Sequence, residues 1–420
     1  MSYVIIGNST AAIGAIESIR KYDRTTPITL VSDEPWHTYS RPLISYYLGG
    51  KVKEENMIYR PLDFYTNNNV ETLLGVKAVK VDFEGKTVAL ENGKTLNYSR
   101  LLIATGGKPF VPPMEGLGKK KIFNFIKFDD VKEIEKVAVK GSRAVVVGAS
   151  FSGLKAVEAL VKRGVDITVI DIMSRIMPRV LDDTAAGIAR TRLEENGVKV
   201  LLGNTVDKIL GDDTATGVLL KDGTQIDCDF IILAIGVRCN TDLVKDTGIK
   251  LNRGIVVDDH MRTSIPGVYA AGDVAEGYNF IEDKMMEIAI IPNAYNQGET
   301  AGANMAGVDR SFNQGFIMNS MPLLDLPIIS AGASEEREGL EVIKISIPEK
   351  NVYKKFYISG NKLVGFLLIT DVDRAGIYTD MIRNGSDISA FRDKIGTENF
   401  GFKDLPKQAR KEKMLKGGAF

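Results

Sequence analysis

The hydrophobic pattern of this chain contains one unit twice. A β-branched run at 3–6 leads into small residues and then a helical spacing of apolar positions, and the same order returns from 144–147 onward. Each helical stretch is followed by a second apolar run, at 28–31 and at 167–170, with an acid close behind it. Strand, tight turn, helix and parallel strand make up a βαβ unit. The sequence therefore predicts two βαβ units of the same kind.

Further apolar runs predict the rest of the fold. Two buried strands, at 101–104 and 230–233, run into glycine turns, and a third at 268–271 ends in Gly-Asp. A helix is predicted at 294–305 with Asn293 as its N-cap. Beyond about residue 312 alternating strands precede a helix, which indicates a separate α+β domain. These last elements are expected at 341–347, 353–359, 363–369 and 375–383.

Charge and cysteine content exclude several functional classes. The 420 residues carry 54 Lys and Arg against 54 Asp and Glu, so the chain lacks the net charge typical of nucleic-acid binding. Two cysteines, Cys228 and Cys239, and two histidines, His37 and His260, cannot supply a zinc or iron–sulfur site. We therefore expect no metal site, and chemistry that needs a redox metal must come from another molecule.

The sequence shows no signal for export or membrane insertion. The first strand begins at Tyr3, which leaves no room for a signal peptide, and no apolar run approaches the roughly 18 residues of a membrane span. We expect a cytoplasmic protein without a membrane span.

Small residues follow the first strand of each βαβ unit, where a bound dinucleotide would need them. Backbone N–H groups there can approach a pyrophosphate at a helix N-terminus, whose dipole favours negative charge. The first copy offers Gly7, Ser9 and Ala12, and the second offers Gly148, Ser150 and Gly153. Both copies carry serine where the usual pattern has its second glycine. An acid suited to a ribose follows each second strand, Asp33 and Asp171.

The acid of the second copy also discriminates between cofactors. The Asp171 carboxylate can accept hydrogen bonds from ribose hydroxyls and repels a 2′-phosphate, which favours NADH over NADPH. Arg175 lies four residues further on and could accommodate a phosphate. A solvated acid at a strand end is the alternative interpretation of Asp171.

Several segments together resemble the FAD-dependent pyridine nucleotide–disulfide oxidoreductase superfamily. Within it the chain is most similar to NADH:rubredoxin and ferredoxin reductases and to the flavoprotein part of NADH-dependent nitrite reductase. The segments that carry the resemblance are Gly7–Ala12, Tyr39–Ser45, Ala104–Gly107, Gly148–Gly153, Ala234–Val237, Thr263–Asp273, Leu363–Gly365 and Asp371–Tyr378. The resemblance implies an α/β fold with two Rossmann-like dinucleotide-binding domains, one for FAD and one for NAD, plus the C-terminal α+β domain.

The resemblance also implies domain boundaries. The FAD-binding domain is expected to be discontinuous, at 1–110 and 240–312, with the NAD-binding domain at 111–239 between its parts. The C-terminal α+β domain is expected at 313–402. Residues 403–420 carry six basic and two acidic side chains and are interpreted as a basic tail, either solvated or used in docking.

Individual site residues follow from the same resemblance. It implies that Gly7 and Ala11 contact the FAD pyrophosphate, that Asp33 holds the adenosine ribose, and that Asp273 binds the ribityl chain. Arg41 and Pro42 would line the flavin side, Lys127 would lie beside the isoalloxazine, and Ile291 with the start of the following helix would face the pyrimidine ring. Ala78 would touch adenine, although plain core packing is an equal alternative for Ala78 and Ile291. The predicted FAD-binding set is Gly7, Ser9, Ala11, Ala12, Asp33, Arg41, Pro42, Ala78, Ala104, Thr105, Gly106, Lys127, Gly272, Asp273 and Ile291. The predicted NAD-binding set is Gly148, Ser150, Gly153, Asp171 and Gly236.

Missing residues exclude the thiol-dependent members of the superfamily. Disulfide reductases need two closely spaced redox cysteines and a C-terminal histidine, whereas Cys228 and Cys239 are 11 residues apart and no histidine follows His260. Branches that use a single cysteine place it where this chain has Ser45, which cannot form a thiolate. Cys228 and Cys239 are therefore interpreted as packing residues.

Lys155 is the main departure from the pattern. The superfamily usually has glutamate beside the nicotinamide at this position, and the sequence places a cation there. Lys155 is the candidate for a catalytic contact that would stabilise anionic reduced flavin; a surface lysine is the alternative.

The predicted function is transfer of electrons from NADH through FAD to a separate protein. The acceptor would be a rubredoxin, a ferredoxin-type iron–sulfur carrier, or an iron–sulfur subunit of a larger dehydrogenase, recognised through the third domain or the basic tail. Two alternatives stay open: an NADH oxidase or diaphorase that reduces oxygen or small acceptors directly, and a non-catalytic flavoprotein that senses NADH. An oligomer is possible, and the sequence does not specify the oligomeric state.

Overall fold

In the computed structural model, which describes residues 2–407 and 410–411, the first βαβ unit lies in a five-stranded sheet of order β19-β7-β1-β2-β3. All four pairings in this sheet are parallel. The central strand is buried along its whole length, as expected for a parallel sheet covered on both faces. The strands are β1 (Tyr3–Ile6), β2 (Ile28–Ser32), β3 (Val70–Leu74), β7 (Arg100–Ile103) and β19 (Val268–Ala270).

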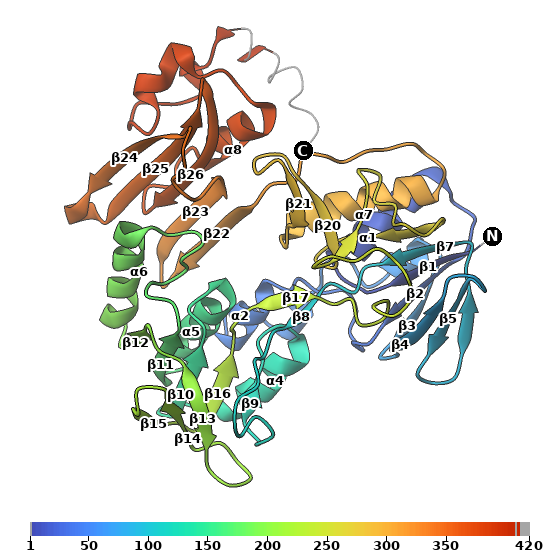
Figure 1. The fold of residues 1–420 in the computed structure, drawn as a ribbon, viewed down its shortest axis with the longest axis horizontal. Coiled ribbons are helices and arrows are strands. Elements are labelled where there is room, and N and C mark those ends of the chain that lie inside the picture. Colours follow the sequence, from blue (N-terminus) through green and yellow to red (C-terminus); the bar gives the residue numbers. More distant parts are fainter. Residues whose placement is uncertain (1, 408–409, 412–420) are drawn as a thin grey trace. The chain divides into compact units, whose positions relative to one another are not determined.

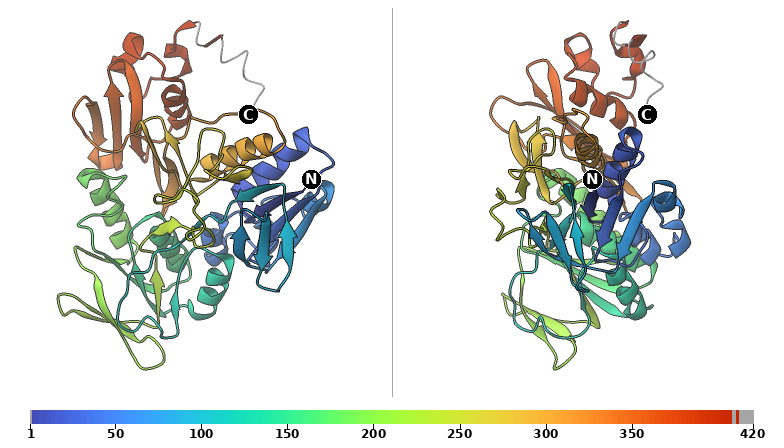
Figure 2. Two further views of the ribbon diagram at one scale, coloured as in Figure 1. Left: turned by 45° about the vertical axis from the view of Figure 1, so that its right-hand side comes forward. Right: turned by 90° about the vertical axis from the view of Figure 1, so that its right-hand side faces the viewer.

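Two helices that are far apart in the sequence pack against each other beside this sheet. They are α1 (Thr10–Tyr22) and α7 (Ile291–Met305), which run side by side in Figures 1 and 2. Glycines on α7 allow the close approach: a Cβ on Gly298 would lie 2.0 Å from the carbonyl oxygen of Ala11, and one on Gly302 would lie 2.4 Å from that of Ala15. This crossing fixes where the N-terminus of α7 points.

The predicted start of α7 is wrong by three residues. The helix begins at Ile291, with Pro292 in its first turn, rather than after a cap at Asn293. Proline fits the first turn because the N–H that it lacks would have no partner inside the helix. Asn293 is buried within the helix, and its side-chain amide donates to the Ile288 carbonyl at 3.1 Å.

Shorter elements complete the part of the chain that is built around this first sheet, which we call the first half. Antiparallel strands form one sheet from β4 (Ala78–Asp82), β5 (Thr87–Leu90) and β6 (Thr95–Asn97). A second small sheet consists of β18 (Ile255–Val256), β20 (Ala275–Asn279) and β21 (Lys284–Glu287). The remaining helices are α2 (Leu43–Leu48), α3 (Phe64–Asn67) and the 3₁₀ turn Glu54–Asn56.

The second βαβ unit repeats this architecture in a sheet of order β12-β11-β10-β16-β9. The sheet is parallel throughout, and α5 (Phe151–Lys162) connects β10 to β11. Its strands are β9 (Ile122–Phe123), β10 (Arg143–Val147), β11 (Asp166–Asp171), β12 (Lys199–Leu202) and β16 (Phe230–Leu233). A side sheet contains β13 (Val206–Leu210), β14 (Gly217–Leu220) and β15 (Gln225–Asp227), and α4 (Phe128–Val137) precedes β10.

A two-stranded ribbon joins the two halves. It pairs β8 (Gly107–Pro109) with β17 (Val237–Cys239) in antiparallel register, so that Gly107 lies opposite Cys239. Asn240 extends the pairing, because the Thr105 hydroxyl donates to its carbonyl at 2.8 Å.

The chain divides into two compact units, Met1–Ile172 with Gly197–Ile317, and Met173–Asn196 with Met318–Phe420. The second unit contains an antiparallel sheet of order β22-β23-β26-β25-β24. Its strands are β22 (Met318–Leu323), β23 (Leu326–Gly332), β24 (Glu341–Ile347), β25 (Val352–Ser359) and β26 (Lys362–Ile369). Its helices are α6 (Asp183–Glu195), α8 (Ala375–Asn384) and 3₁₀ turns at Pro348–Lys350, Ser389–Lys394 and Phe402–Asp404.

A buried lysine connects α6 to this antiparallel sheet. Lys355 on β25 is almost fully buried and pairs with Asp182 at 2.8 Å and Glu336 at 2.9 Å. Asp182 also caps α6 by accepting from the Ala185 N–H, and it accepts from the Tyr353 hydroxyl at 2.6 Å. The segment Met173–Asn196 is thereby tied to the strands of its own unit.

The predicted fold class is confirmed: two parallel βαβ sheets are followed by an α+β region. The strands expected at 341–347, 353–359 and 363–369 and the helix expected at 375–383 correspond to β24, β25, β26 and α8 within one residue at each end. The boundaries 1–110, 111–239, 240–312 and 313–402 stay a prediction. Most of the expected basic tail, at 408–409 and 412–420, lies outside the described residues. Within the described part of the chain, no helix is long and apolar enough to cross a membrane.

Candidate nucleotide-binding site

Gly7 and Gly148 occupy the same position in two copies of one turn. Their φ angles are +119° and +113°, a region that glycine adopts without strain. A Cβ on Gly7 would lie 2.1 Å from the carbonyl oxygen of Ala104, and one on Gly148 would lie 2.3 Å from that of Ala234. Each turn is therefore pressed against the end of the neighbouring strand, at the edge of a parallel sheet where dinucleotides bind.

The residues that follow each glycine leave the helix N-termini accessible. Ser9 and Ser150 precede α1 and α5 with extended backbones, and neither side chain caps its helix. The Ser150 hydroxyl instead donates to the Ala234 carbonyl at 3.2 Å, and the Ser9 hydroxyl accepts from Arg41 at 3.3 Å. Uncapped N–H groups at a helix start suit a pyrophosphate.

Small side chains at the third position of each turn are required by packing. Ala11 and Ala12 are buried in the first copy. In the second copy a Cβ on Gly153 would lie 1.9 Å from the Gly148 carbonyl oxygen. The sequence rule for these turns therefore has a steric basis in both copies.

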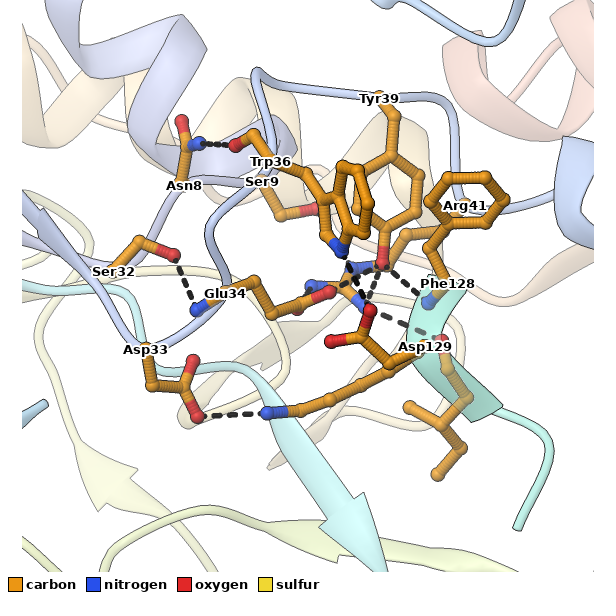
Figure 3. A network of polar contacts seen from close by, with 12 residues as sticks. Asn8, Ser9, Ser32, Asp33, Glu34, Trp36, Tyr39, Arg41, Phe128 and Asp129 are labelled. Carbon is orange, nitrogen blue, oxygen red and sulfur yellow. Dashed lines mark hydrogen bonds and ion pairs between the residues drawn. The ribbon is translucent and has the colours of Figure 1, made fainter. Parts of the chain in front are cut away.

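A charged network surrounds Arg41 at the carboxyl end of β2 (Figure 3). The Glu34 carboxylate accepts from the Arg41 guanidinium at 2.5 Å and from the Tyr39 hydroxyl at 2.7 Å. Arg41 also donates to the Tyr39 hydroxyl at 3.0 Å, and the same hydroxyl accepts from the Phe128 N–H at 3.1 Å. Glu34 is buried. Burial alone would lower the pKa of Arg41, but Tyr39 and Glu34 raise the pKa above its ordinary value. The cation is therefore fixed in one place beside the first turn.

Two of the predicted FAD residues form an ion pair. The Lys127 ammonium lies 2.7 Å from the Asp33 carboxylate, and both side chains are about half exposed. Lys127 thus lies next to the residue predicted to hold the adenosine ribose. Its place beside the isoalloxazine and the ribose contact of Asp33 both stay predictions.

Asp273 follows β19 where α1 and α7 meet. Its backbone neighbour Gly272 donates to the Gln297 side chain at 2.8 Å, and a Cβ on Gly272 would lie 3.1 Å from that of Ala11. Burial raises the pKa of Asp273, and Arg41 opposes this shift. Among the described residues no donor reaches its carboxylate, which fits a ligand that brings its own hydroxyl groups.

The other predicted FAD residues lie on the same carboxyl edge or in its core. Pro42 precedes α2, Ile291 begins α7 and is 37% exposed, and Gly106 has φ +66°. Ala78 begins β4 and belongs to the hydrophobic core of the first half. These placements fit FAD, and the contacts of each residue with it stay predictions.

The second site is built around Asp171 at the end of β11. Its carboxylate accepts from the Ala149 N–H at 2.6 Å, so the acid is held by the turn that follows Gly148. Gly236, with φ +152°, follows β16. The guanidinium of Arg175 is engaged in its own loop: it donates to the carbonyls of Leu181 and Pro178 at 3.1 and 3.2 Å and pairs with Asp183 at 3.2 Å.

Lys155 lies on the first turns of α5, not at the open surface. Its ammonium pairs with Glu158 at 2.6 Å and lies 4.7 Å from the centroid of the Tyr46 ring. Sequence reasoning missed both Glu158 and Glu34. The signal for Glu158 was its spacing of three from Lys155 on one helix face, and the signal for Glu34 was its position in an acidic pair at a strand end.

The two thiols are unsuited to redox chemistry at neutral pH. Cys228 and Cys239 are free and buried. Burial raises the pKa of Cys228 to about 12 and that of Cys239 to about 11. Because the thiolate is the reactive form, both side chains act as packing residues.

Comparison with known proteins agrees with this geometry. The family model described as pyridine nucleotide-disulphide oxidoreductase matches residues 1–298, and the model described as rubredoxin NAD+ reductase C-terminal domain matches residues 318–386. The chain is 32% identical to a nitrite reductase [NAD(P)H] of Bacillus subtilis, over 92% of this chain and 48% of that protein. It is also 32% identical to an NADH oxidase of Methanocaldococcus jannaschii, over 89% of this chain and 85% of that protein.

A solved structure shows the same fold over almost the whole chain. The reductase in a covalent putidaredoxin reductase–putidaredoxin complex superposes with a TM-score of 0.85 at 25% identity, covering 91% of this chain and 93% of that one. The chain spans about half the length of the first curated relatives that it matches.

Proposed function

We propose that this chain, which belongs to the pyridine nucleotide-disulphide oxidoreductase family, is an FAD-dependent oxidoreductase that takes electrons from NADH and passes them to a separate iron–sulfur or rubredoxin-type protein. The observation that carries the proposal is the duplication of one nucleotide turn, with Gly7 and Gly148 under the same steric constraint. Two such turns in one unit suit a reaction between two dinucleotides.

The residues of this chain have distinct tasks in this reaction. The uncapped starts of α1 and α5 would bind the two pyrophosphates. Arg41, held by Glu34 and Tyr39, would provide a fixed positive charge on the flavin side, and Asp273 would accept from the ribityl hydroxyls. Bound FAD would supply the conversion of a hydride into single electrons. The protein would contribute orientation and electrostatics, and no side chain needs to transfer a proton.

We also propose NADH rather than NADPH as the electron donor. Asp171 lies where its charge would repel a 2′-phosphate. Arg175, the cation that could offset this repulsion, is committed to Leu181, Pro178 and Asp183. A cytoplasmic location stays a prediction.

Three observations support a protein acceptor. The C-terminal match is to a domain named after rubredoxin reductase, and a structural neighbour was solved with putidaredoxin bound. The thiols of Cys228 and Cys239 are buried and protonated, so they offer no route for electrons. Electrons that reach the flavin would therefore not pass through thiols of this chain, which leaves an external acceptor as their destination.

Anaerobic stopped-flow mixing tests the proposal. NADH should bleach the flavin of the holoenzyme faster than NADPH does, and an added rubredoxin or ferredoxin should then be reduced many times faster than oxygen is. Failure of NADH to bleach the flavin would overturn the proposal and would favour a non-catalytic NADH sensor. If NADH does bleach the flavin, a pull-down from native extract should identify the iron–sulfur partner.

Direct reduction of oxygen is the second candidate function. The identity with a protein named NADH oxidase favours it. The position that carries a cysteine in single-cysteine branches is Ser45 here, which argues against it. Rapid oxygen consumption with no gain from any carrier would establish the oxidase.

A further inference from the structure

Three lysines converge on one buried carboxylate beside the junction of α2 and α5. Glu158 on α5 is 4% exposed. Its carboxylate lies 2.6 Å from the ammonium of Lys155, 3.7 Å from that of Lys162 and 3.9 Å from that of Lys51. These side chains line a small pocket that also includes Tyr46. The cluster carries two more positive charges than negative ones.

This cluster lies where the two nucleotide-binding halves meet. Lys155 comes two residues after Gly153 of the second turn, whereas Tyr46 lies on α2, which directly follows Arg41 and Pro42. The Lys155 ammonium lies 4.7 Å from the Tyr46 ring centroid, so it crosses from one half to the other. Hydride transfer requires the reacting atoms to approach to roughly 3–3.5 Å, and it can occur only where the halves meet.

We propose that Glu158 is a positioning residue that holds the Lys155 ammonium against Tyr46 and thereby fixes a positive charge at the nicotinamide–flavin junction. The inference rests on the proposed function. Glu158 does not itself reach the reacting groups, because its carboxylate is surrounded by the three lysines. Without it, the Lys155 side chain has lost its ionic partner and extends toward solvent.

The α2–α5 contact does not depend on this carboxylate. A Cβ on Gly49 would lie 3.5 Å from the Cα of Ala159, and the Arg163 guanidinium donates to the Leu48 carbonyl at 3.1 Å. Glu158→Gln keeps the shape of the side chain and leaves both contacts in place. Its effect therefore reports on Lys155 rather than on the helix junction.

The sign of the change in flavin reduction potential distinguishes positioning from simple electrostatics. Removal of the Glu158 negative charge would by itself stabilise reduced flavin and raise the potential. Loss of the Lys155 cation from the junction would lower it. The positioning role predicts that Glu158→Gln lowers the potential and slows flavin reduction by NADH about tenfold. This change in rate corresponds to an increase of roughly 1.4 kcal/mol in the activation free energy.

A double-mutant cycle in the holoenzyme tests whether Glu158 acts through Lys155. In a Lys155→Ala background, Glu158→Gln should neither lower the flavin potential nor slow flavin reduction by NADH. Lys162→Gln, which removes another cation from the same carboxylate, is the matched control and should leave the rate within about twofold. A raised potential in Glu158→Gln, or an equal slowing in both backgrounds, would overturn the inference.

A labelling experiment separates this inference from the proposed function. In Glu158→Gln the Lys155 amine should react with an acylating reagent several-fold faster than in the wild-type apoprotein, as read by mass spectrometry, while Lys80 reacts equally in both. If NADH fails to bleach the flavin of the wild-type enzyme, the proposed function fails whatever the labelling shows. If NADH bleaches it normally and Lys155 labelling is unchanged, only the positioning role fails.

Discussion

Asp171 is oriented by the turn that it would serve. Its carboxylate accepts from the N–H of Ala149, one residue after Gly148, so the acid is tied directly to the turn proposed to bind a pyrophosphate. Asp171→Ala should weaken NADH binding about tenfold, the loss of one charge-assisted hydrogen-bonding group, and weaken NADPH binding less because a repulsive charge is removed. Equilibrium titration of the FAD-loaded enzyme with each nucleotide measures the ratio of the NADH and NADPH affinities.

The matched control is Asp166→Ala at the exposed start of the same strand. It removes an equal charge from β11 and should leave both affinities unchanged. Equal weakening of NADH and NADPH binding by Asp171→Ala would contradict the assigned discrimination.

At the residue scale, the sequence predicts positions that are constrained by local sterics. Gly7, Gly148 and Gly153 can be placed because a turn between strand and helix excludes side chains there. Two partners of Arg41 cannot be placed, because they come from segments far apart: Ile126 is 85 residues away and Ser9 is 32. Such contacts arise from the fold, not from spacing along the chain.

The α1–α7 crossing leaves no room for a side chain at two glycines of α7. Gly298→Ala would place a Cβ 2.0 Å from the Ala11 carbonyl oxygen and force the helices apart. Overpacking of this kind typically costs about 1–3 kcal/mol, and it should also weaken FAD binding because Ala11 and the start of α7 move together. Urea unfolding of the apoprotein and flavin titration give the two effects.

A glycine in an open environment provides the comparison. Gly187 lies on α6, and a Cβ at this position would meet no atom within 4 Å apart from its chain neighbours and the backbone of its own helix, so Gly187→Ala should stabilise the helix by about 0.5–1 kcal/mol. Stabilisation by both substitutions would show that helix propensity dominates and would contradict the steric constraint assigned to Gly298.

Asp182 makes the second unit sensitive to acid. Burial alone would raise the pKa of Asp182, but hydrogen bonds from Lys355, Tyr353 and the Ala185 N–H lower it overall. A lowered folded-state pKa means that this stabilisation is present above about pH 4 and is lost as the pH falls through the folded pKa. Asp182→Asn should therefore reduce stability by about 1–3 kcal/mol at neutral pH, with a difference that shrinks toward pH 2.

Hydrogen exchange of the β25 amides measures the stability of the second unit separately from that of the first. The neighbouring Asp183→Asn removes an exposed charge, 91% accessible, and should change protection by less than about 0.5 kcal/mol. A destabilisation by Asp182→Asn that is constant from pH 7 to about pH 2 would contradict the assigned ionisation.

Element boundaries show what periodicity can and cannot predict. Strands such as β24 match the alternation of apolar residues, whereas the start of α7 is misplaced when Asn293 is interpreted as a cap. Its side-chain NH2 group donates to the Ile288 carbonyl, which lies in the turn before α7. The membership of α6 in the second unit also has no signal in the sequence, because it depends on the buried Lys355–Asp182 pair.

At the scale of the whole molecule, the net charge is zero, so an acidic electron carrier would have to be recognised by a local group of basic side chains. Raising ionic strength from about 50 to 200 mM should slow reduction of an acidic carrier several-fold, while reduction of a small neutral quinone by NADH is unaffected. Lys407→Glu at the described part of the tail should reduce the carrier rate, and Lys80→Glu on β4 should not. An equal salt response with carrier and quinone would argue against electrostatic docking.

The β8–β17 ribbon brings together the two ends of the segment that lies between these strands. Because Gly107 lies opposite Cys239, the polypeptide leaves the first half and returns to it at adjacent points. Everything between these strands is topologically an insertion, and insertions with neighbouring ends are tolerated by the fold that receives them. The intervening segment should therefore be exchangeable as a cassette, provided that the insert keeps α6 and Asp182, which pairs with Lys355 of the second unit. A relative's insert joined at the same two strands would then transfer its nucleotide preference without rebuilding the first half.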